Sequence, residues 1–358
     1  MKKNLLHRSL SVTAISGNGG SNVGPIDINN YLTIEALEDG LTASLSENAC
    51  EYCVDGDGDW KTIAASATTE SINAGQTVSF RGNLTPLTNK GVGTFTINKK
   101  CNLKGNCMSM LFGDDVINNT SLSGKDYSFY KLFYNCANII TVSSDFLPAI
   151  TLDAYCYHRM FYGCTSLTSV PELPATTLKS DCYSYMFYGC TSLTKAPELP
   201  ATTLAEQCYL SMFYRCTSLI TAPALPATTL TNTCYKSMFS SCTSLTTAPE
   251  LPATTLTEQC YCEMFRECES LVTVPNLPAT TLTKQCYDHM FYNCTKLNYI
   301  KMLATDISAT DCLYYWVYHV SSTGLFVKNA NMTSLPTATS SSEYTGIPSG
   351  WTVQNAVS

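Results

Sequence analysis

The chain repeats itself with a step of 26 residues. One series of cysteines keeps this step from end to end of the repeated region, and its members are Cys156, Cys182, Cys208, Cys234, Cys260, Cys286 and Cys312. A second series runs beside it and comprises Cys164, Cys190, Cys216, Cys242, Cys268 and Cys294. A fixed period of this length is typical of units that stack on one another, because a single unit cannot bury its apolar side alone. We therefore expect a repeat solenoid.

Each unit contains a stretch whose apolar residues recur at steps of four. Cys208, Met212 and Cys216 follow this spacing, and Thr203 with Glu206 fits a capping box just before them. Such spacing places the apolar side chains on one face of a short amphipathic helix. The pattern therefore predicts one short helix in every unit.

The remainder of each unit predicts a short strand and a corner. Leu193–Ala196 is too short for anything but a strand, and Pro197 and Pro200 then interrupt pairing and turn the chain. The expected fold class is thus an α+β solenoid of leucine-rich-repeat type, whose coils consist of a short parallel strand, a proline corner and a short helix.

The cysteines are expected to be core residues. Along a helix the two cysteines of one unit would lie about 12 Å apart, and neighbouring helices pack about 8–10 Å apart. A disulfide requires Cα atoms within about 7 Å, so small buried thiols are the favoured interpretation. Disulfides and a metal site are less favoured alternatives, because a spacing of eight residues lacks the close cysteine pair of most zinc sites.

The rest of the chain divides into three further segments. Gly, Ser and Asn are frequent near the N-terminus, and alternating apolar residues separated by Gly and Asn turns then predict antiparallel strands. The expected organisation is an extended arm at residues 1–30, a small β-sandwich at 31–100, the solenoid at 101–312 and a C-terminal cap at 313–358. The first coils of the solenoid are degenerate, and the repeat becomes regular from about residue 147.

The repeat resembles a known family. The pattern Met-Phe-x-x-Cys-x-Ser-Leu-Thr-x-x-Pro occurs at 160–171 and four more times through 264–275, with Ile220 and Val272 in place of the Thr in two copies, and it is similar to BspA-like leucine-rich repeats. The segments YLTIEALEDGLTASLS, FRGNLTP and GIPSGWTV resemble companions of such repeats in proteins of gut anaerobes and phages. The resemblance implies one parallel strand per coil and a role in adhesion or protein binding, with no catalytic residues.

Charge and hydropathy exclude several partners. The net charge is −7, and no cluster of Lys and Arg follows Lys2 and Lys3, so nucleic acid is not an expected partner. No stretch approaches the roughly 20 apolar residues of a membrane span. The first 20 residues begin with basic side chains but contain no uninterrupted apolar run, so we expect a chain that is not exported by the usual route.

Catalytic and metal motifs find little support. His158 and His289 occupy repeat positions that other residue types fill elsewhere, which predicts surface positions, and Cys262 is a candidate exposed thiol. The acidic run at 55–59 has the alternating carboxylates of a calcium loop but lacks the later Gly and Glu, so an Asp-Gly hairpin turn is favoured. We expect no enzyme activity, no cofactor and no metal.

Binding has a clearer physical basis, because equivalent residues of stacked coils form rows about 4.8 Å apart. One expected row on the sheet consists of Ser169, Lys195, Thr221, Thr247 and Thr273. A second row consists of Glu172, Glu198, Ala224, Glu250 and Asn276. A third row consists of Tyr162, Tyr188, Tyr214 and Tyr292, and it suits either sugar and protein contacts or a place in the core.

These features predict a non-enzymatic binding, adhesion or structural protein. The favoured hypothesis is a phage virion component made in the host cytoplasm. Its N-terminal arm and β-domain would attach to other virion or surface-assembly proteins, and its solenoid would face a host protein or glycan. The alternative is a bacterial cell-surface adhesin, and a homo-oligomer is compatible with both. A hydrolase with an unrecognised site is the least favoured hypothesis.

Overall fold

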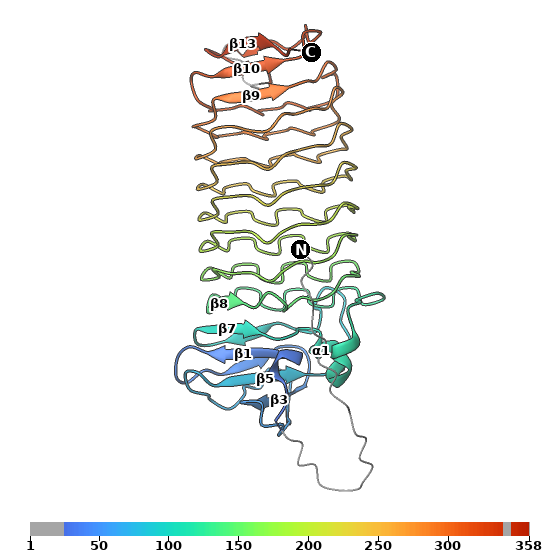
Figure 1. The fold of residues 1–358 in the computed structure, drawn as a ribbon, viewed down its shortest axis with the longest axis vertical. Coiled ribbons are helices and arrows are strands. Elements are labelled where there is room, and N and C mark those ends of the chain that lie inside the picture. The colour runs from blue at the N-terminus through green and yellow to red at the C-terminus, as the bar shows by residue number, and fades with distance from the viewer. Residues whose placement is uncertain (1–24, 339–344, 358) are drawn as a thin grey trace, which may run out of the picture.

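The protein is a long stack of coils with a sheet of antiparallel strands at one end (Figure 1). The computed structural model describes residues 25–338 and 345–357. In Figure 1 the N-terminal strands lie at the lower end of the stack and β9, β10 and β13 lie at the upper end. The expected arm at 1–30 falls mostly outside the described residues.

The N-terminal strands form one large sheet and one small one. The large sheet has the strand order β4-β3-β5-β1-β7-β8. Its strands are β1 (Leu32–Ala36), β3 (Cys50–Val54), β4 (Lys61–Ile63), β5 (Thr77–Arg81), β7 (Cys101–Lys104) and β8 (Ile139–Val142). The small sheet pairs β2 (Ala43–Leu45) with β6 (Phe95–Ile97). The register of β1 on β5 sets Ile34 opposite Val78, and both side chains are fully buried.

The large sheet runs directly into the stack. Strand β1 pairs with β5 and β7 in the antiparallel sense, whereas β7 pairs with β8 in the parallel sense. A parallel bridge then joins Thr141 of β8 to Ser169 of the next coil. The short helices of the described residues are η1 (Ile28–Asn30), α1 (Ser109–Phe112) and η2 (Gly113–Asn118). The N-terminal sheet therefore provides the template on which the first coils stack.

The regular coils pair through single residues. Parallel bridges connect Lys195, Thr221, Thr247, Thr273 and Tyr299 in succession. A longer β-ladder would need backbone N–H groups on the residues that follow each bridge residue. Two of these, at two and five positions after the bridge residue, are prolines, which have no N–H group. Each expected strand is therefore shortened to one bridge. The first longer strand after them is β9 (Tyr299–Met302), whose coil has Lys301 and Ala304 at the positions of the two prolines.

The coil spacing continues beyond the last recognisable repeat. Strand β10 (Leu325–Lys328) pairs in parallel with β9 on one side and with β13 (Thr352–Asn355) on the other. A separate two-stranded sheet pairs β11 (Thr337–Ala338) with β12 (Ile347–Pro348). Trp316 is fully buried, and its indole N–H donates to the carbonyl of Gly346 at 3.1 Å. The C-terminal residues thus continue the sheet of the stack with a different sequence.

The predicted helix of each unit is wrong. Within the repeat, the N–H of Met160 donates to the carbonyl of Tyr157 three residues earlier, as in a turn. The next N–H, that of Phe161, donates instead to the carbonyl of Met186 in the following coil at 3.0 Å. Turn bonds and coil-to-coil bonds alternate in this way along the whole segment, so an α-helical ladder cannot form.

A left-handed residue at every fourth position gives the segment its shape. In six successive coils the central such residue has φ between 50° and 56°, and these residues are Arg159, Tyr185, Ser211, Ser237, Glu263 and His289. Others lie four residues before and four after, and two of the latter are the glycines of the early coils. The pattern predicts a helix because, over only nine residues, apolar residues spaced four apart are hard to distinguish from the 3.6-residue turn of an α-helix. The steps of four reflect four-residue turns and not a helix face.

The core of the stack consists of ladders of identical side chains. Phe161, Phe187, Phe213 and Phe239 stack with ring centroids 5.7 Å apart at each step. A parallel tyrosine ladder is also fully buried and comprises Tyr157, Tyr183, Tyr209, Tyr235, Tyr261 and Tyr287. Each aromatic ring covers the next one, so every coil excludes water from its neighbours.

All nineteen cysteines are buried free thiols, which confirms the core position predicted for the two repeat series. In the second series each thiol donates to a phenylalanine carbonyl of the preceding coil, as Cys216 does to Phe187 at 3.1 Å. Burial raises the pKa of these thiols, and that of Cys190 lies well above its usual value. Cysteine therefore supplies a small apolar side chain whose S–H group is a weak hydrogen-bond donor to the phenylalanine carbonyl of the preceding coil.

Candidate functional site

The two polar rows expected on the sheet lie on the outer surface of the stack. The row of Ser169, Lys195, Thr221, Thr247 and Thr273 is exposed throughout, and so is the row of Glu172, Glu198, Ala224, Glu250 and Asn276. In one coil, buried and exposed residues follow one another along the chain. Ala196, Pro197 and Leu199 are buried, whereas Glu198 and Pro200 are exposed. We call this surface, with the exposed prolines beside it, the row face.

Two grooves interrupt the row face. The larger groove has a volume of about 610 Å³ and is lined by residues of three successive coils. It brings together members of both rows, and its polar lining is Ser144, Thr168, Ser169, Glu172, Lys195 and Glu198. The smaller groove, of about 360 Å³, is lined by Ala224, Glu250 and several apolar residues. Pro174 and Pro200 supply rigid apolar walls in the larger groove, and Pro226 and Pro252 do so in the smaller one.

The charged side chains of the larger groove have no ion-pair partner among the described residues. Neither Glu172 nor Glu198 lies within 4.0 Å of a cationic nitrogen, and the Nζ of Lys195 lies that close to no carboxylate. An exposed carboxylate without an internal partner exchanges water for a ligand's donor groups without first losing an ion pair within the protein. The groove therefore offers two carboxylates, one ammonium group, three hydroxyl groups and apolar walls.

The tyrosine row lies elsewhere on the surface and is half-buried. The rings of Tyr162 and Tyr188 stack 4.4 Å apart, and those of Tyr188 and Tyr214 stack 4.7 Å apart. Tyr292 belongs to a second stack, in which the guanidinium of Arg266 lies 5.0 Å from its ring centroid. Because each ring face is covered by a neighbour, these residues present ring edges and hydroxyl groups to solvent. In the described part of the chain no tyrosine lines either groove.

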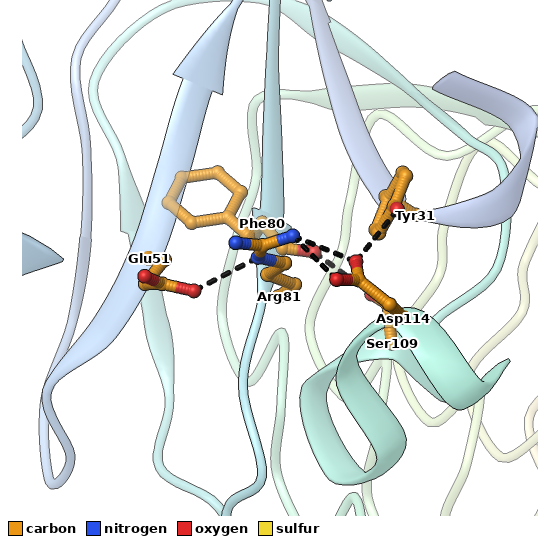
Figure 2. A network of polar contacts seen from close by, with 6 residues as sticks. All are labelled: Tyr31, Glu51, Phe80, Arg81, Ser109 and Asp114. Atoms are coloured by element: carbon orange, nitrogen blue, oxygen red, sulfur yellow. Dashed lines mark hydrogen bonds and ion pairs between the residues drawn. The ribbon is translucent and has the colours of Figure 1, made fainter. Parts of the chain in front are cut away.

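A network of polar contacts lies at the N-terminal end of the molecule (Figure 2). The guanidinium of Arg81 donates to Glu51 at 2.8 Å and to both oxygens of Asp114 at 2.7 and 2.8 Å. The hydroxyl of Tyr31 also donates to Asp114 at 2.8 Å, and burial together with this carboxylate raises the pKa of Tyr31 to about 12. The ring of Trp60 lies 4.1 Å from the guanidinium.

This network binds elements of the fold together. It joins β3, β5 and Tyr31, the residue before β1, to η2, and Ser109 of α1 reinforces it by donating to the carbonyl of Phe80 at 2.8 Å. The adjoining hollow of about 400 Å³ contains Arg81, but two carboxylates already neutralise its charge. The arrangement is a structural clasp, and it offers no free cation to an anionic ligand.

The isolated candidates from the sequence do not form a site. Cys262 is buried, with its pKa raised to about 12 by burial, so the expectation of an exposed thiol is wrong. His158 is also buried, and burial lowers its pKa to about 3, whereas His289 is half-buried. The surface position predicted for His158 fails because the rings of Tyr130 and Tyr155 lie against it.

The acidic run at 55–59 forms the predicted hairpin turn between β3 and β4. Its carboxylates bind backbone groups, since Asp57 accepts from the N–H of Asp59 and Asp55 accepts from the N–H of Thr77. Within residues 25–338 and 345–357, no group of three or more His, Cys, Asp or Glu side chains is placed to hold a metal ion.

Sequence reasoning missed part of the groove and the whole clasp. The exposed prolines of the groove were visible as the second proline of every unit, but they were assigned only to a corner. The clasp has no sequence signature, because Arg81 and Asp114 are 33 residues apart and meet only through the fold.

Comparisons with known proteins identify the repeat. A family model described as BspA type Leucine rich repeat region matches six copies, over residues 130–263 and 232–335. No curated protein matches the chain. None of the described helices has both the length and the apolar character needed to cross a membrane.

Proposed function

The chain belongs to the BspA-type leucine-rich repeat family, and from this premise we propose that it is a non-enzymatic binding protein whose row face contacts a protein or a glycan. The observation that carries the proposal is the larger groove, where Glu172, Glu198 and Lys195 are exposed and have no ion-pair partners among the described residues. The family supports surface adhesion and protein–protein interaction in general.

The finer architecture is part of the proposal. We infer a rigid solenoid over residues 101–312, a small β-sandwich at 31–100 that attaches the protein to a larger assembly, and a cap at 313–358. The stacked coils and their parallel bridges support a rigid solenoid. The continuous sheet from β1 to β8 supports a firm connection between the attachment part and the binding part.

The larger groove can be tested by removing its charges without changing its shape. In the double variant Glu172→Gln, Glu198→Gln the side chains keep their size and lose their charge. Glu206→Gln is the matched control, because Glu206 is exposed but lies outside the groove. An array of host-surface glycoproteins and glycans, probed with the wild-type protein, first identifies a ligand.

We expect the double variant to bind that ligand about tenfold more weakly or worse, because charge-assisted hydrogen bonds are lost. The Glu206→Gln protein should bind like the wild type. Equal binding by all three proteins would remove the groove from the proposal, and failure of the wild-type protein to bind any arrayed surface would count against the binding role itself.

The most specific form of the proposal is a phage virion component, with a bacterial cell-surface adhesin as the alternative. The likeness of the flanking segments to companions of such repeats in phage and gut-anaerobe proteins is compatible with both. The family supports a surface location in either case. Mass spectrometry of purified virions and protease shaving of intact, phage-free cells distinguish the two. The chain in virions supports the first, whereas its release from phage-free cells supports the second.

A further inference from the structure

A cation lies at each end of the tyrosine stack in the early coils. The stack consists of Tyr134, Tyr162, Tyr188 and Tyr214, whose ring centroids are 4.8, 4.4 and 4.7 Å apart at successive steps. At one end the Nζ of Lys131 lies 5.2 Å from the ring centroid of Tyr134. At the other end the guanidinium of Arg215 lies 5.6 Å from that of Tyr214.

A third cation, Arg159, lies beside the same stack. Its guanidinium is 4.9 Å from the ring centroid of Tyr185, and the ring of Tyr185 lies 6.1 Å from that of Tyr188. Arg159 also neighbours Lys131, because the N–H of Lys131 donates at 3.0 Å to the carbonyl of the residue just before Arg159. The three cations and the four stacked tyrosines therefore form one surface, which we call the cation patch.

None of the three cations is neutralised by a carboxylate in the part of the chain that the structure describes. No carboxylate oxygen lies within 4.0 Å of Lys131, Arg159 or Arg215. In a later coil Arg266 shows the contrast, because its guanidinium lies 3.4 Å from both Glu263 and Glu267. The molecule thus pairs the cation on its later tyrosine stack and leaves the charge of the early stack uncompensated.

The chemistry of the patch favours an anionic glycan. Ammonium and guanidinium groups donate hydrogen bonds and accept none, so they fit the oxygens of carboxylate or sulfate groups. Nucleobases need open aromatic faces to stack on, and here neighbouring rings and cations cover those faces. Protein interfaces centre on buried apolar anchors. None of the exposed large apolar side chains of the described residues lies in the segments that carry the patch, which are 127–136, 155–164, 181–190 and 207–216.

We propose that the cation patch binds an anionic polysaccharide that lies along the stack. Its carboxylate or sulfate groups contact Lys131, Arg159 and Arg215, and its hydroxyl groups contact those of the tyrosines. Coils repeat at about 4.8 Å, so the three steps between the coils of Lys131 and Arg215 amount to about 14 Å. A chain of several sugar units is therefore needed to reach both ends. The patch is separate from the row face, and the proposal is independent of what the row face binds.

Two pairs of polymers test the requirement for charge. Dextran sulfate is compared with neutral dextran, and polygalacturonate with its methyl ester, because the members of each pair share a backbone and differ in their anionic groups. A single-stranded oligothymidylate is the third probe. Biolayer interferometry measures the dissociation constants, and urea unfolding checks that each variant is folded.

Two triple variants separate the patch from the overall charge. The patch variant is Lys131→Gln, Arg159→Gln, Arg215→Gln. The matched control is Lys61→Gln, Lys284→Gln, Lys296→Gln, which removes the same charge from positions outside the patch. Arg215→Gln alone changes an exposed residue and reports on the patch even where the triple variant unfolds.

We expect the wild type and the control to bind at least one anionic polymer and neither neutral one. The patch variant should bind at least about tenfold more weakly, and Arg215→Gln about threefold more weakly. The row-face variant Glu172→Gln, Glu198→Gln should bind like the wild type. Binding of dextran sulfate alone identifies a sulfated glycan, and binding of polygalacturonate alone identifies a uronic acid polymer. Wild-type protein that binds neither polymer, equal weakening in the control, or equal affinity for the oligothymidylate would overturn the proposal.

Discussion

Replacing one left-handed serine by glycine and by alanine tests the backbone of the repeat directly. Ser211 lies in the middle of the four-residue turns of its coil with φ of 50°, and it is only 5% exposed. Both substitutions remove the same hydroxyl, so the difference between them reports the backbone. In a helix interior, glycine is about 1 kcal/mol less stable than alanine. At a left-handed position the order is reversed.

The size of the reversal follows from two opposing terms. A left-handed conformation costs a residue with a Cβ atom roughly 1–2 kcal/mol, which glycine avoids. Glycine loses about 0.5–1 kcal/mol of that advantage through its greater freedom in the unfolded chain. We therefore expect the glycine variant to be about 0.5–1 kcal/mol more stable than the alanine variant. In a helix the glycine variant would be about 1 kcal/mol less stable, so the two structures differ by about 1.5–2 kcal/mol in this comparison.

Urea unfolding of the two variants, followed by circular dichroism, measures the difference. Ser237 holds the equivalent place in the next coil with φ of 53°, so the same pair of substitutions there should give the same sign. An alanine variant that is more stable than the glycine variant at both positions would show that the segment is helical in solution and would refute the turn structure.

Three further predictions concern the interior and the clasp. The nineteen thiols should resist alkylation in the native protein and all react in denaturant without reductant, and a shortfall there would indicate disulfides. Folding lowers the pKa of His158 to about 3, so as the pH falls the unfolded chain takes up a proton before the folded one does. The contribution of neutral His158 to the free energy of unfolding is therefore complete above about pH 6.5. Towards pH 3 it decreases by on the order of 4 kcal/mol. His158→Leu, which copies Leu210 two coils later, should remove that part of the acid sensitivity in unfolding measured against pH, and an unchanged pH profile would contradict the assignment. Arg81→Lys should cost about 1–2 kcal/mol in urea unfolding, because one ammonium cannot replace the guanidinium's simultaneous bonds to Glu51 and Asp114, and a wild-type midpoint would show that the clasp contributes nothing.

The sequence predicts the repeat and the interior well because both depend on residue spacing alone. A step of 26 residues sets the coil length, and invariant small or aromatic positions must face inward whatever the backbone does. For this reason the cysteines could be assigned to the core although the argument used a helix that does not exist. The short strands were placed correctly at Lys195 and its equivalents, but their length depends on which N–H groups the prolines leave available.

The backbone of the turns could not be predicted, because most of its left-handed positions carry residue types that do not favour this conformation. Arg159, Tyr185 and Glu263 share one left-handed position, although such residues rarely adopt it in isolation. Bonds between coils, such as that from Phe161 to Met186, stabilise this conformation, and they exist only once neighbouring coils are present. The grooves escaped prediction for a related reason, since their shape depends on how far apart the walls of neighbouring coils lie.

Because the backbone is the same from coil to coil, the coils of the row face differ mainly in the side chains that each row carries. Because every coil repeats the same turns, a substitution on the row face alters the surface without moving its neighbours. Lys195 stands in a row that otherwise carries hydroxyls, and Ala224 stands in a row of mainly acidic residues. The larger groove consequently has two carboxylates and an ammonium group, whereas the smaller one has a single carboxylate, Glu250, between apolar walls. The proposed ligand, if it spans both grooves, would meet two carboxylates and an ammonium group in one and a single carboxylate between apolar walls in the other, so the two directions along the stack are not equivalent for it.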